Sequence, residues 1–433
     1  MKNGWNLSCP MPATGVLAEG VYNAGAGLAD DIFTATAEDS YMQIVTEQSA
    51  ADYETYAQTL KQAGYQQVGA NQLGDNLYAD FAKENTVVHI SFIAATKELR
   101  VVEDKCSVSP KDFSYENKGE AKTTIYQYGL YYDPLNRVID NTAVNCGMLY
   151  VVKLSDNSLF MVDGGHLYQC TNEMIEALWK FLHEITQTPD GDTIRIAAWY
   201  ITHAHGDHVT ACSKLLKRYH DQIDLQRMMY NFPSYQVRPG GYDDLTTIMK
   251  NVVRAWYPNV PFLKIHTGQK IQLADMVVDV LYTHEDAVRA ENPTTYPLGD
   301  YNCTSSILRL DIEGKKVLML GDANVEAEAI IAKTSQSSVW KGDLVQVAHH
   351  CFNYLNTLYP WIAAPVVFLP NSYYGAHTPG DNEPKLRTIL AYVKNDQIYY
   401  EGEGTYGLQV QDDGFACVYE APVVGGEYDG SGI

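Results

Sequence analysis

The chain has 433 residues, of which 46% are hydrophobic and 19% are charged, so it can bury a sizeable core and is not of a disordered or collagen-like class. Its formal net charge of −22 repels phosphate backbones and anionic lipid surfaces at long range, which makes a nucleic-acid binder or a membrane-surface protein an unfavoured interpretation. No run of 18 apolar residues predicts a membrane-spanning helix. Without a recognisable signal peptide or any C-x-x-C pair among the eight cysteines, we expect a reduced, cytoplasmic protein.

The first predicted unit, residues 1–115, is a small α+β domain whose role the sequence leaves open. A strand is expected at residues 42–46. Ser49 can then cap a helix over residues 50–63. Strand-like runs follow at residues 76–81, 86–94 and 98–103, which predicts a β-α-β-β-β order.

The second predicted unit, residues 121–433, alternates strands with amphipathic helices, which is typical of an α/β layered domain. A polar stretch at residues 109–123 is expected to link the two units. The expected strands lie at residues 148–153, 158–162, 194–202, 271–273, 277–282, 305–312, 317–320, 344–348 and 365–369. The expected helices lie at residues 172–185, 210–219, 325–333 and 384–393.

The strongest chemical signal is the segment His-Ala-His-Gly-Asp-His at residues 203–208, between a hydrophobic strand and a helix. Three imidazoles and one carboxylate within six residues are not explained by packing. Imidazole nitrogen and carboxylate oxygen suit zinc and related divalent ions. The H-x-H pair can face one ion while Asp207 and His208 reach a second, as in two-metal sites.

This segment resembles the HxHxDH signature of the metallo-β-lactamase superfamily of hydrolases. Three further motifs fit in order: residues 160–165, with a strand-to-turn Asp-Gly-Gly; residues 318–322, ending in Gly-Asp; and residues 345–350, ending in His-His. The resemblance covers residues 124–415. It implies an αββα sandwich over residues 121–433, preceded by the small α+β domain.

A narrower resemblance points to the competence-protein-like branch, which includes phosphorylcholine-esterase-like and other phosphodiesterase-like hydrolases. It is carried by residues 302–310, by the His-His pair and by the Asn-Ser-Tyr-Tyr-Gly-Ala-His segment at 371–377. The chain departs from that branch in two places. Cys351 stands where the branch has glycine, and Val-Thr-Ala rather than a glycine pair follows the HxHxDH segment.

Carried onto this chain, the resemblance implies two divalent ions, expected to be zinc with manganese or iron as alternatives. The implied ligands are His203, His205 and His284 for the first ion, Asp207, His208 and His350 for the second, and Asp322 as the bridge. Asp163 is expected to support the loop that carries the ligands. For His284, a loop residue without a ligand role is the alternative.

The pair His349 and His350 leaves a choice open. A strand points successive side chains to opposite faces, so only one of the two should face the metal. We assign His350 as the ligand and His349 as a residue beside it or facing the substrate, with the reverse as the alternative. Asp207 is also expected to take part in proton transfer. His377 is expected to donate to a leaving group or an anionic oxygen, with a solvated loop residue as the alternative.

The implied function is that of a dinuclear metal-dependent hydrolase, in which a hydroxide between the ions attacks a phosphorus or carbonyl centre. We expect a small-molecule ester substrate, a phosphoester or phosphodiester. Hydrolysis of a lactone or another carboxylic ester is one alternative, and a non-catalytic metal-binding protein on the same fold is another. The net charge argues against long DNA as the substrate. The sequence leaves the oligomeric state open.

Overall fold

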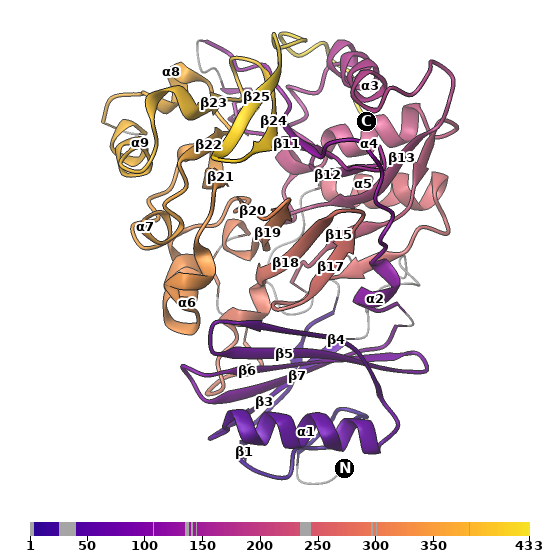
Figure 1. Ribbon diagram of the computed structural model, residues 1–433, viewed down its shortest axis with the longest axis vertical. Helices are drawn as coiled ribbons and strands as arrows, with labels where there is room; N and C mark the ends of the chain where they lie inside the picture. Colours follow the sequence, from indigo (N-terminus) through magenta and orange to yellow (C-terminus); the bar gives the residue numbers. More distant parts are fainter. Residues whose placement is uncertain are drawn as a thin grey trace.

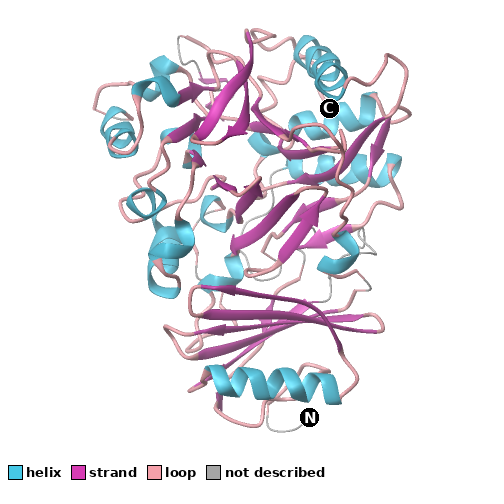
Figure 2. Ribbon diagram, viewed as in Figure 1, coloured by secondary structure: helices cyan, strands magenta, loops and turns pink. Residues whose placement is uncertain are grey.

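The computed structural model describes residues 4–25, 40–106, 108–134, 138–139, 142–143, 145–233, 244–295, 298–299, 301–380 and 382–433. A small sheet with one long helix forms the end of the molecule near the N-terminus, and a larger body of sheets flanked by helices forms the rest (Figures 1 and 2). No helix of the described residues is long and apolar enough to cross a membrane.

The N-terminal sheet has the strand order β1-β3-β7-β6-β5-β4, with β2 beside β3. Helix α1 (Ala50–Gln62) lies along one face (Figure 1), and Ser49 caps it by accepting a hydrogen bond from the amide of Asp52. The buried side of α1 includes Tyr53, Tyr56 and Leu60, which join the core of the sheet. The strands are β1 (Val16–Leu17), β2 (Tyr22–Asn23), β3 (Ser40–Thr46), β4 (Gln66–Leu73), β5 (Asn76–Lys83), β6 (Thr86–Ile93) and β7 (Glu98–Asp104).

This sheet contains strands that the predicted β-α-β-β-β order lacks. Strand β4 is the clearest case: its sequence is Gln-Gln-Val-Gly-Ala-Asn-Gln-Leu, and most of its residues are at least partly exposed. It is an edge strand that pairs antiparallel with β5. Backbone hydrogen bonds therefore form β4 without the hydrophobic alternation by which a strand is recognised in a sequence.

Two larger sheets build the second part of the chain. One has the order β16-β15-β13-β12-β11-β8-β24-β25, with β14 beside β13, and the other runs from β17 through to β23 in sequence order. The strands of the first are β8 (Thr124–Gln127), β11 (Leu149–Lys153), β12 (Leu159–Asp163), β13 (Ile194–Tyr200), β14 (Ile223–Leu225), β15 (Met228–Tyr230), β16 (Phe262–Lys264), β24 (Thr405–Gln411) and β25 (Gly414–Ala421). Those of the second are β17 (Lys270–Leu273), β18 (Met276–Tyr282), β19 (Ile307–Ile312), β20 (Lys315–Met319), β21 (Leu344–Gln346), β22 (Val366–Leu369) and β23 (Ile398–Tyr400). The short strands β9 (Val138–Ile139) and β10 (Thr142–Ala143) pair with each other.

Three apolar cores show how these sheets are layered. One core joins residues of both sheets, such as Val152 and Phe160 from one and Leu310 and Met319 from the other. A second core packs α3 (Asn172–Thr186), α4 (Thr210–Arg218) and α5 (Asp244–Trp256) on the outer face of the first sheet. The third packs α6 (Val325–Thr334), α7 (Leu358–Ile362) and α9 (Glu383–Leu390) on the outer face of the second sheet. The predicted αββα sandwich, preceded by a small α+β unit, is confirmed.

The predicted linker is partly structured. It contains α2 (Pro110–Phe113), and the buried ring of Phe113 belongs to the core between the two large sheets. The backbone of Tyr115 pairs with that of Leu273 at the start of the second sheet. The segment therefore ties the N-terminal unit to the sandwich.

The seam between the N-terminal sheet and the sandwich is a buried cluster of charges. The Lys264 ammonium lies 2.6 Å from a Glu285 oxygen, and the His266 ring lies between Glu285 at 2.7 Å and Asp104 at 2.8 Å. Asp104 comes from β7, whereas the other three belong to the sandwich. Arg100, also on β7, donates to the backbone oxygen of Glu285 at 3.0 Å. The two units are joined by paired charges that are buried in this seam.

Replacing Lys264 by alanine should destabilise the chain by about 3–5 kcal/mol, because the carboxylates of Glu285 and Asp104 would stay buried without their ammonium partner. The measurement is the free energy of unfolding from urea denaturation. Lys270→Ala is the matched control: its side chain is 51% exposed and lies 3.9 Å from Asp279, so it should cost less than about 1 kcal/mol. Equal losses in both variants would contradict a structural role for the seam.

His266 gives the seam a pH dependence with a defined sign. Burial lowers its pKa, but Glu285 and Asp104 outweigh burial and raise the pKa from 6.5 to about 9. The stability that the imidazolium contributes is therefore full below pH 6.5 and is lost as the pH rises through about 9. We expect the unfolding free energy of the wild type to fall over this interval, and that fall should be smaller in His266→Asn. An identical pH profile for the two proteins would contradict this assignment.

Candidate metal centre

The loop that carries the His-Ala-His-Gly-Asp-His segment is anchored by Asp163. β12 and β13 are parallel neighbours, so their carboxyl ends lie at the same edge of the sheet. Asp163 ends β12, and its carboxylate accepts hydrogen bonds from the backbone amide and the hydroxyl of Thr202 at 2.9 and 3.0 Å. It also accepts from Nδ1 of His208 at 2.8 Å. One carboxylate therefore fixes both the start of the loop and the ring of its last histidine.

Asp322 lies on a turn at the end of β20, in the facing sheet. Gly321 has a φ of +54°, and a Cβ at this position would lie 2.9 Å from Cβ of Thr202 and 3.1 Å from Cβ of Ser305. Glycine is therefore required for the turn to approach the histidine loop this closely. The backbone amide of Asp322 donates to the Ser305 hydroxyl at 3.0 Å. The two sheets thus meet at this edge with their functional loops in contact.

His349 and His350 follow β21, the parallel neighbour of β20. They do not continue the strand: His349, His350 and Cys351 all have positive φ, at 48°, 50° and 66°. The alternation rule used for the sequence does not apply to such a left-handed turn. The amide of His349 donates to the carbonyl of Gly321 at 3.1 Å, so this turn is tied directly to the turn of Asp322.

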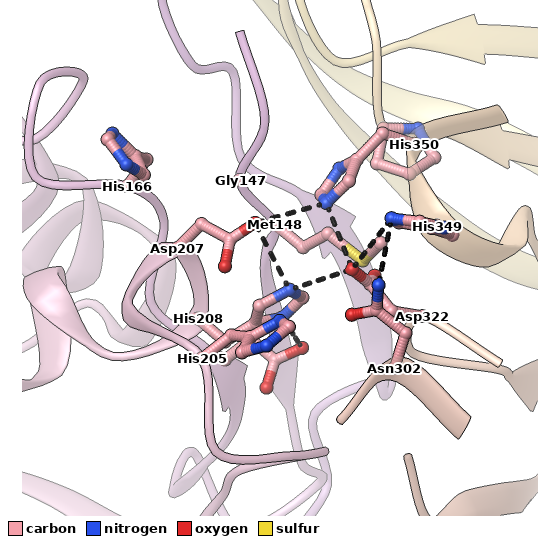
Figure 3. Close-up of polar contacts among 12 residues, drawn as sticks. Gly147, Met148, His166, His205, Asp207, His208, Asn302, Asp322, His349 and His350 are labelled. Carbon is pink, nitrogen blue, oxygen red and sulfur yellow. Dashed lines mark hydrogen bonds and ion pairs between the residues drawn. The ribbon is translucent and has the colours of Figure 1, made fainter. Parts of the chain in front are cut away.

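The side chains converge on Asp322, as Figure 3 shows. Its Oδ2 atom lies 3.3 Å from Nε2 of His350 and 3.4 Å from Nε2 of His208. The same oxygen lies 3.9 Å from Nε2 of both His203 and His349. One carboxylate oxygen is therefore surrounded by imidazole nitrogens from two loops.

This group fits a metal ion. The ligand atoms of Asp207, His208, Asp322 and His350 all lie within 4.8 Å of one another. Among the described residues, Oδ1 of Asp322 and Nε2 of His208 and His350 are buried and have no hydrogen-bond partner. Buried polar atoms are nearly always paired. A divalent cation bound by these nitrogen and oxygen atoms would satisfy them.

The protonation states follow from charge and burial. Burial lowers the pKa of His203 well below 6.5, and His208 and His205 lower it further, so its ring is neutral at neutral pH. Burial also opposes the charge of His350, but Asp322 and Asp207 raise its pKa to about 10. The carboxylates of Asp163, Asp322 and Asp207 likewise overcome burial and hold the pKa of His208 well above its usual value. In the metal-free centre, protons on His208 and His350 balance the negative charge of the carboxylates.

The structure brings together most of the residues that the sequence singled out. His203 lies beside His205, with Nε2 of the first 3.0 Å from Nδ1 of the second. Asp207 faces His350, with its Oδ2 3.4 Å from Nε2. The residues gathered at this edge are Asp163, His203, His205, Asp207, His208, Asp322, His349 and His350.

His284 departs from its expected place. It does follow the end of a strand, β18, but that end faces the N-terminal sheet. Its Nε2 lies 2.9 Å from Oδ1 of Asn231, and its Nδ1 lies 3.2 Å from the hydroxyl of Tyr22. Burial lowers its pKa to about 3, so the ring is neutral. His284 is a hydrogen-bonded residue of the seam between the units.

His377 also lies outside the group described above. It follows the short helix α8 (Tyr373–Ala376), and its ring stacks on Tyr373 with centroids 4.0 Å apart. Its Nδ1 lies 2.8 Å from the carbonyl of Tyr373. Asn371, which precedes α8 in the chain, donates to the carbonyl of His350 at 2.8 Å.

Three residues of the centre carried no assigned role in the sequence. Gln346 accepts from the amides of Leu320 and Gly321 at 2.7 and 2.8 Å, which fixes the turn of Asp322. Asn302 places its amide nitrogen 3.2 Å from Nε2 of His349. Burial, and then Asp207 and Asp322, raise the pKa of the Cys146 thiol well above its usual value. Asn302 and Gln346 lie in motifs that the sequence did mark, whereas Cys146 has no local signal.

Comparison with known proteins gives structural neighbours only. No protein-family model matches the chain, and no curated protein matches it. The metallo-β-lactamase fold protein YhfI from Bacillus subtilis is 11% identical, over 66% of this chain and 100% of that chain, with a TM-score of 0.38. Tm1679, described as a metal-dependent hydrolase of the β-lactamase superfamily, is 12% identical over 67% and 100% of the two chains, with a TM-score of 0.34.

A third neighbour is CmlA, a diiron β-hydroxylase from Streptomyces venezuelae, which is 12% identical over 65% of this chain and 45% of that chain, with a TM-score of 0.31. Similarity this low says nothing about the chemistry of the site. The chain is similar to proteins named for the metallo-β-lactamase fold, and its own sheets and cores show the αββα sandwich.

Metal affinity should rise with pH. Because His208 and His350 hold protons in the metal-free centre, an entering ion must displace them. Affinity should increase by about tenfold per pH unit for each proton displaced. Calorimetric titration of the stripped chain with Zn²⁺ between pH 6 and 8, in buffers of different ionisation enthalpy, measures both the affinity and the released protons. A pH-independent affinity with no proton release would contradict the assignment of these ligands.

Proposed function

We propose that the chain is a metal-dependent hydrolase of the metallo-β-lactamase superfamily with a dinuclear centre. The observation that carries this proposal is the surroundings of Asp322: one buried carboxylate oxygen lies within 3.9 Å of Nε2 in each of His203, His208, His349 and His350. Together with His205 and Asp207, the set supplies imidazole and carboxylate ligands on both sides of a shared carboxylate. A packing role does not need this set of ligands.

The residues of the chain have separable roles in this proposal. When bound, divalent ions would acidify a water molecule and neutralise charge on the attacked group. Asp163 holds the His208 ring by accepting its Nδ1–H, and so directs Nε2 toward Asp322. His208 and His350 hold the pKa of Asp207 below its usual value despite burial. Asp207 therefore stays a carboxylate, able to bind a metal ion or to orient a water molecule.

The substrate class is proposed from the sequence motifs. The segment at 302–310, the His-His pair and the segment at 371–377 resemble the competence-protein-like and phosphorylcholine-esterase-like branch. We propose a small phosphodiester or phosphoester as the substrate, with zinc in the centre and a cytoplasmic location. The structure supports this by placing Asn302 and His349 together beside Asp322. The net charge of −22 disfavours a long polyanion.

The central test of this proposal compares the wild type with Asp322→Asn. The zinc-loaded wild type should hydrolyse a chromogenic phosphodiester faster than a phosphomonoester or a lactone. Asp322→Asn should lose at least one ion and lower kcat/KM by more than about a hundredfold, because the shared carboxylate is gone. Asp224→Asn, on the exposed side of β14, is the matched control and should keep both metals and rate.

The outcomes separate the alternatives. Turnover of the lactone alone would overturn the phosphoester proposal and leave a carboxylic ester hydrolase. Two bound ions with no turnover of any substrate would favour a non-catalytic metal-binding protein. Absence of metal from the wild type after reloading would contradict the hydrolase proposal altogether.

The proposed role of His377 is tested separately. If it donates to the leaving group, His377→Ala should keep the full metal content and lower kcat by about a hundredfold, the usual range for one acid–base group. The measurements are metal analysis and steady-state kinetics. An unchanged kcat would agree with the stacking of its ring on Tyr373 and would assign His377 to the packing of the loop.

A further inference from the structure

Glu401 is a fully buried acidic residue that the proposed mechanism does not use. It follows strand β23, and its backbone amide donates to the carbonyl of Leu369, at the end of β22, at 2.9 Å. Its own carbonyl accepts from the amide of Leu130 at 3.3 Å. Glu401 therefore lies where the second large sheet meets the segment that follows β8 of the first.

The carboxyl of Glu401 has two polar partners among the described residues, and neither is a cation. Oε1 accepts from the backbone amide of Leu149 at 3.2 Å, and Oε2 lies 3.0 Å from the hydroxyl of Tyr132. The same hydroxyl lies 2.9 Å from the carbonyl oxygen of Pro370 and 3.4 Å from that of Gly147. A tyrosine hydroxyl has one hydrogen to donate. One hydrogen cannot make a full hydrogen bond with all three oxygen atoms.

A proton on Oε2 of Glu401 resolves this conflict. The Oε2–H group then donates to the hydroxyl oxygen of Tyr132, whose own hydrogen donates to the carbonyl of Pro370. Oε1 still accepts from the amide of Leu149. A carboxylate, by contrast, would compete with the Pro370 carbonyl for the single hydrogen of Tyr132. The hydrogen bonds are therefore those of a carboxylic acid.

Burial favours the same protonation state. It raises the pKa of Glu401 from 4.5 to about 8, and the groups that lower the pKa, chiefly the Leu149 amide and the charge of His350, offset burial only in part. A buried carboxylate without a cation beside it is costly, whereas a buried polar group whose hydrogen bonds are made is not. Glu401 is thus a neutral hydrogen-bonding group at neutral pH.

Glu401 is connected to the metal centre by Met148, the residue before its amide partner. The carbonyl of Met148 accepts from the amide of Gly165, in the turn that follows β12, at 2.9 Å. Nε2 of Gln346, the side chain that fixes the turn of Asp322, donates to the sulfur of Met148 at 3.3 Å. Figure 3 shows Met148 among the residues of the centre. Met148 therefore contacts both of the loops that carry the candidate ligands.

We infer that Glu401 is a positioning residue of the metal centre and that it serves there as a neutral carboxylic acid. It fixes the start of β11, and Met148 links that position to the turns that follow Asp163 and precede Asp322. The protonation state follows from the hydrogen bonds of Glu401 itself, whereas its role in the centre rests on the proposed function.

The first test measures the zinc affinity of the stripped full chain in competition with a chelator. Glu401→Leu should bind zinc about 10–100-fold more weakly, the usual effect of losing a residue that supports metal ligands. Glu401→Gln should restore nearly the wild-type affinity, because an amide carries a donor and an acceptor as a carboxylic acid does. Glu403→Gln, which changes an exposed carboxylate two residues away, is the matched control and should bind zinc like the wild type.

The second test observes the protonation state directly, by infrared spectroscopy of the metal-free full chain. At pH 6 the wild type should show the carbonyl band of a protonated carboxyl that Glu401→Gln lacks. That band should fade as the pH rises through about 8. Absence of the band, or a zinc affinity of Glu401→Gln as weak as that of Glu401→Leu, would overturn the neutral acid.

The positioning role has its own contrary result. If Glu401→Leu binds zinc as tightly as the wild type, even with a lower free energy of unfolding, Glu401 is a packing residue and the role is overturned. If Glu401→Leu does not fold, Tyr132→Phe decides: it removes one hydroxyl and should also weaken zinc binding, and an unchanged affinity would contradict the role. A wild type that binds no zinc would overturn the proposed function, and the infrared band would still decide the protonation state.

Discussion

The interaction on which the rest of the structure depends is the burial of the Asp322 carboxylate between two loops of histidines. A carboxylate that is 1% exposed is stable only beside positive charge or hydrogen-bond donors. His350, His208 and His349 supply that charge and overcome burial, which holds the pKa of Asp322 well below its usual value. The sandwich brings this about geometrically, because each sheet ends a parallel pair of strands at the same edge, and Gly321 lets the two ends touch.

A second buried charge cluster organises the other end of the sandwich. Lys264, His266 and Glu285 pair with Asp104 of the N-terminal sheet. Glu285 follows His284 directly, so the loop after β18 belongs to this seam and not to the metal centre. Through Tyr22, the N-terminal unit holds His284, a histidine that the sequence marked as a ligand. The structure thus separates the ionic cluster that joins the units from the cluster that could hold a metal ion.

The alternation of strands and helices in the sequence predicted an α/β layered domain, and the clustered histidines predicted a metal-binding loop at residues 203–208. The sandwich and the role of the turn at Asp322 were implied by the family resemblance that the local motifs carry. What depends on contacts far apart in the chain could not be predicted in this way. The partners of His284 lie 53 and 262 residues away in the chain. No pattern in the sequence near His284 therefore predicts them. The alternation of side chains along a strand does not apply to the left-handed turn at His349, so it could not assign the ligand of the His349–His350 pair. The polar edge strand β4 lacks the hydrophobic alternation by which strands are recognised.

The most direct test of this account is an anomalous diffraction map, measured at the zinc absorption edge, of crystals of the full chain reloaded with zinc. The account predicts two peaks flanking Asp322, each about 2.0–2.2 Å from its nitrogen and oxygen ligands. One should lie among Asp207, His208 and His350, and the other beside His203 and His205. A map without peaks at Asp322, or with its strongest peak at His284 in the seam, would contradict the account.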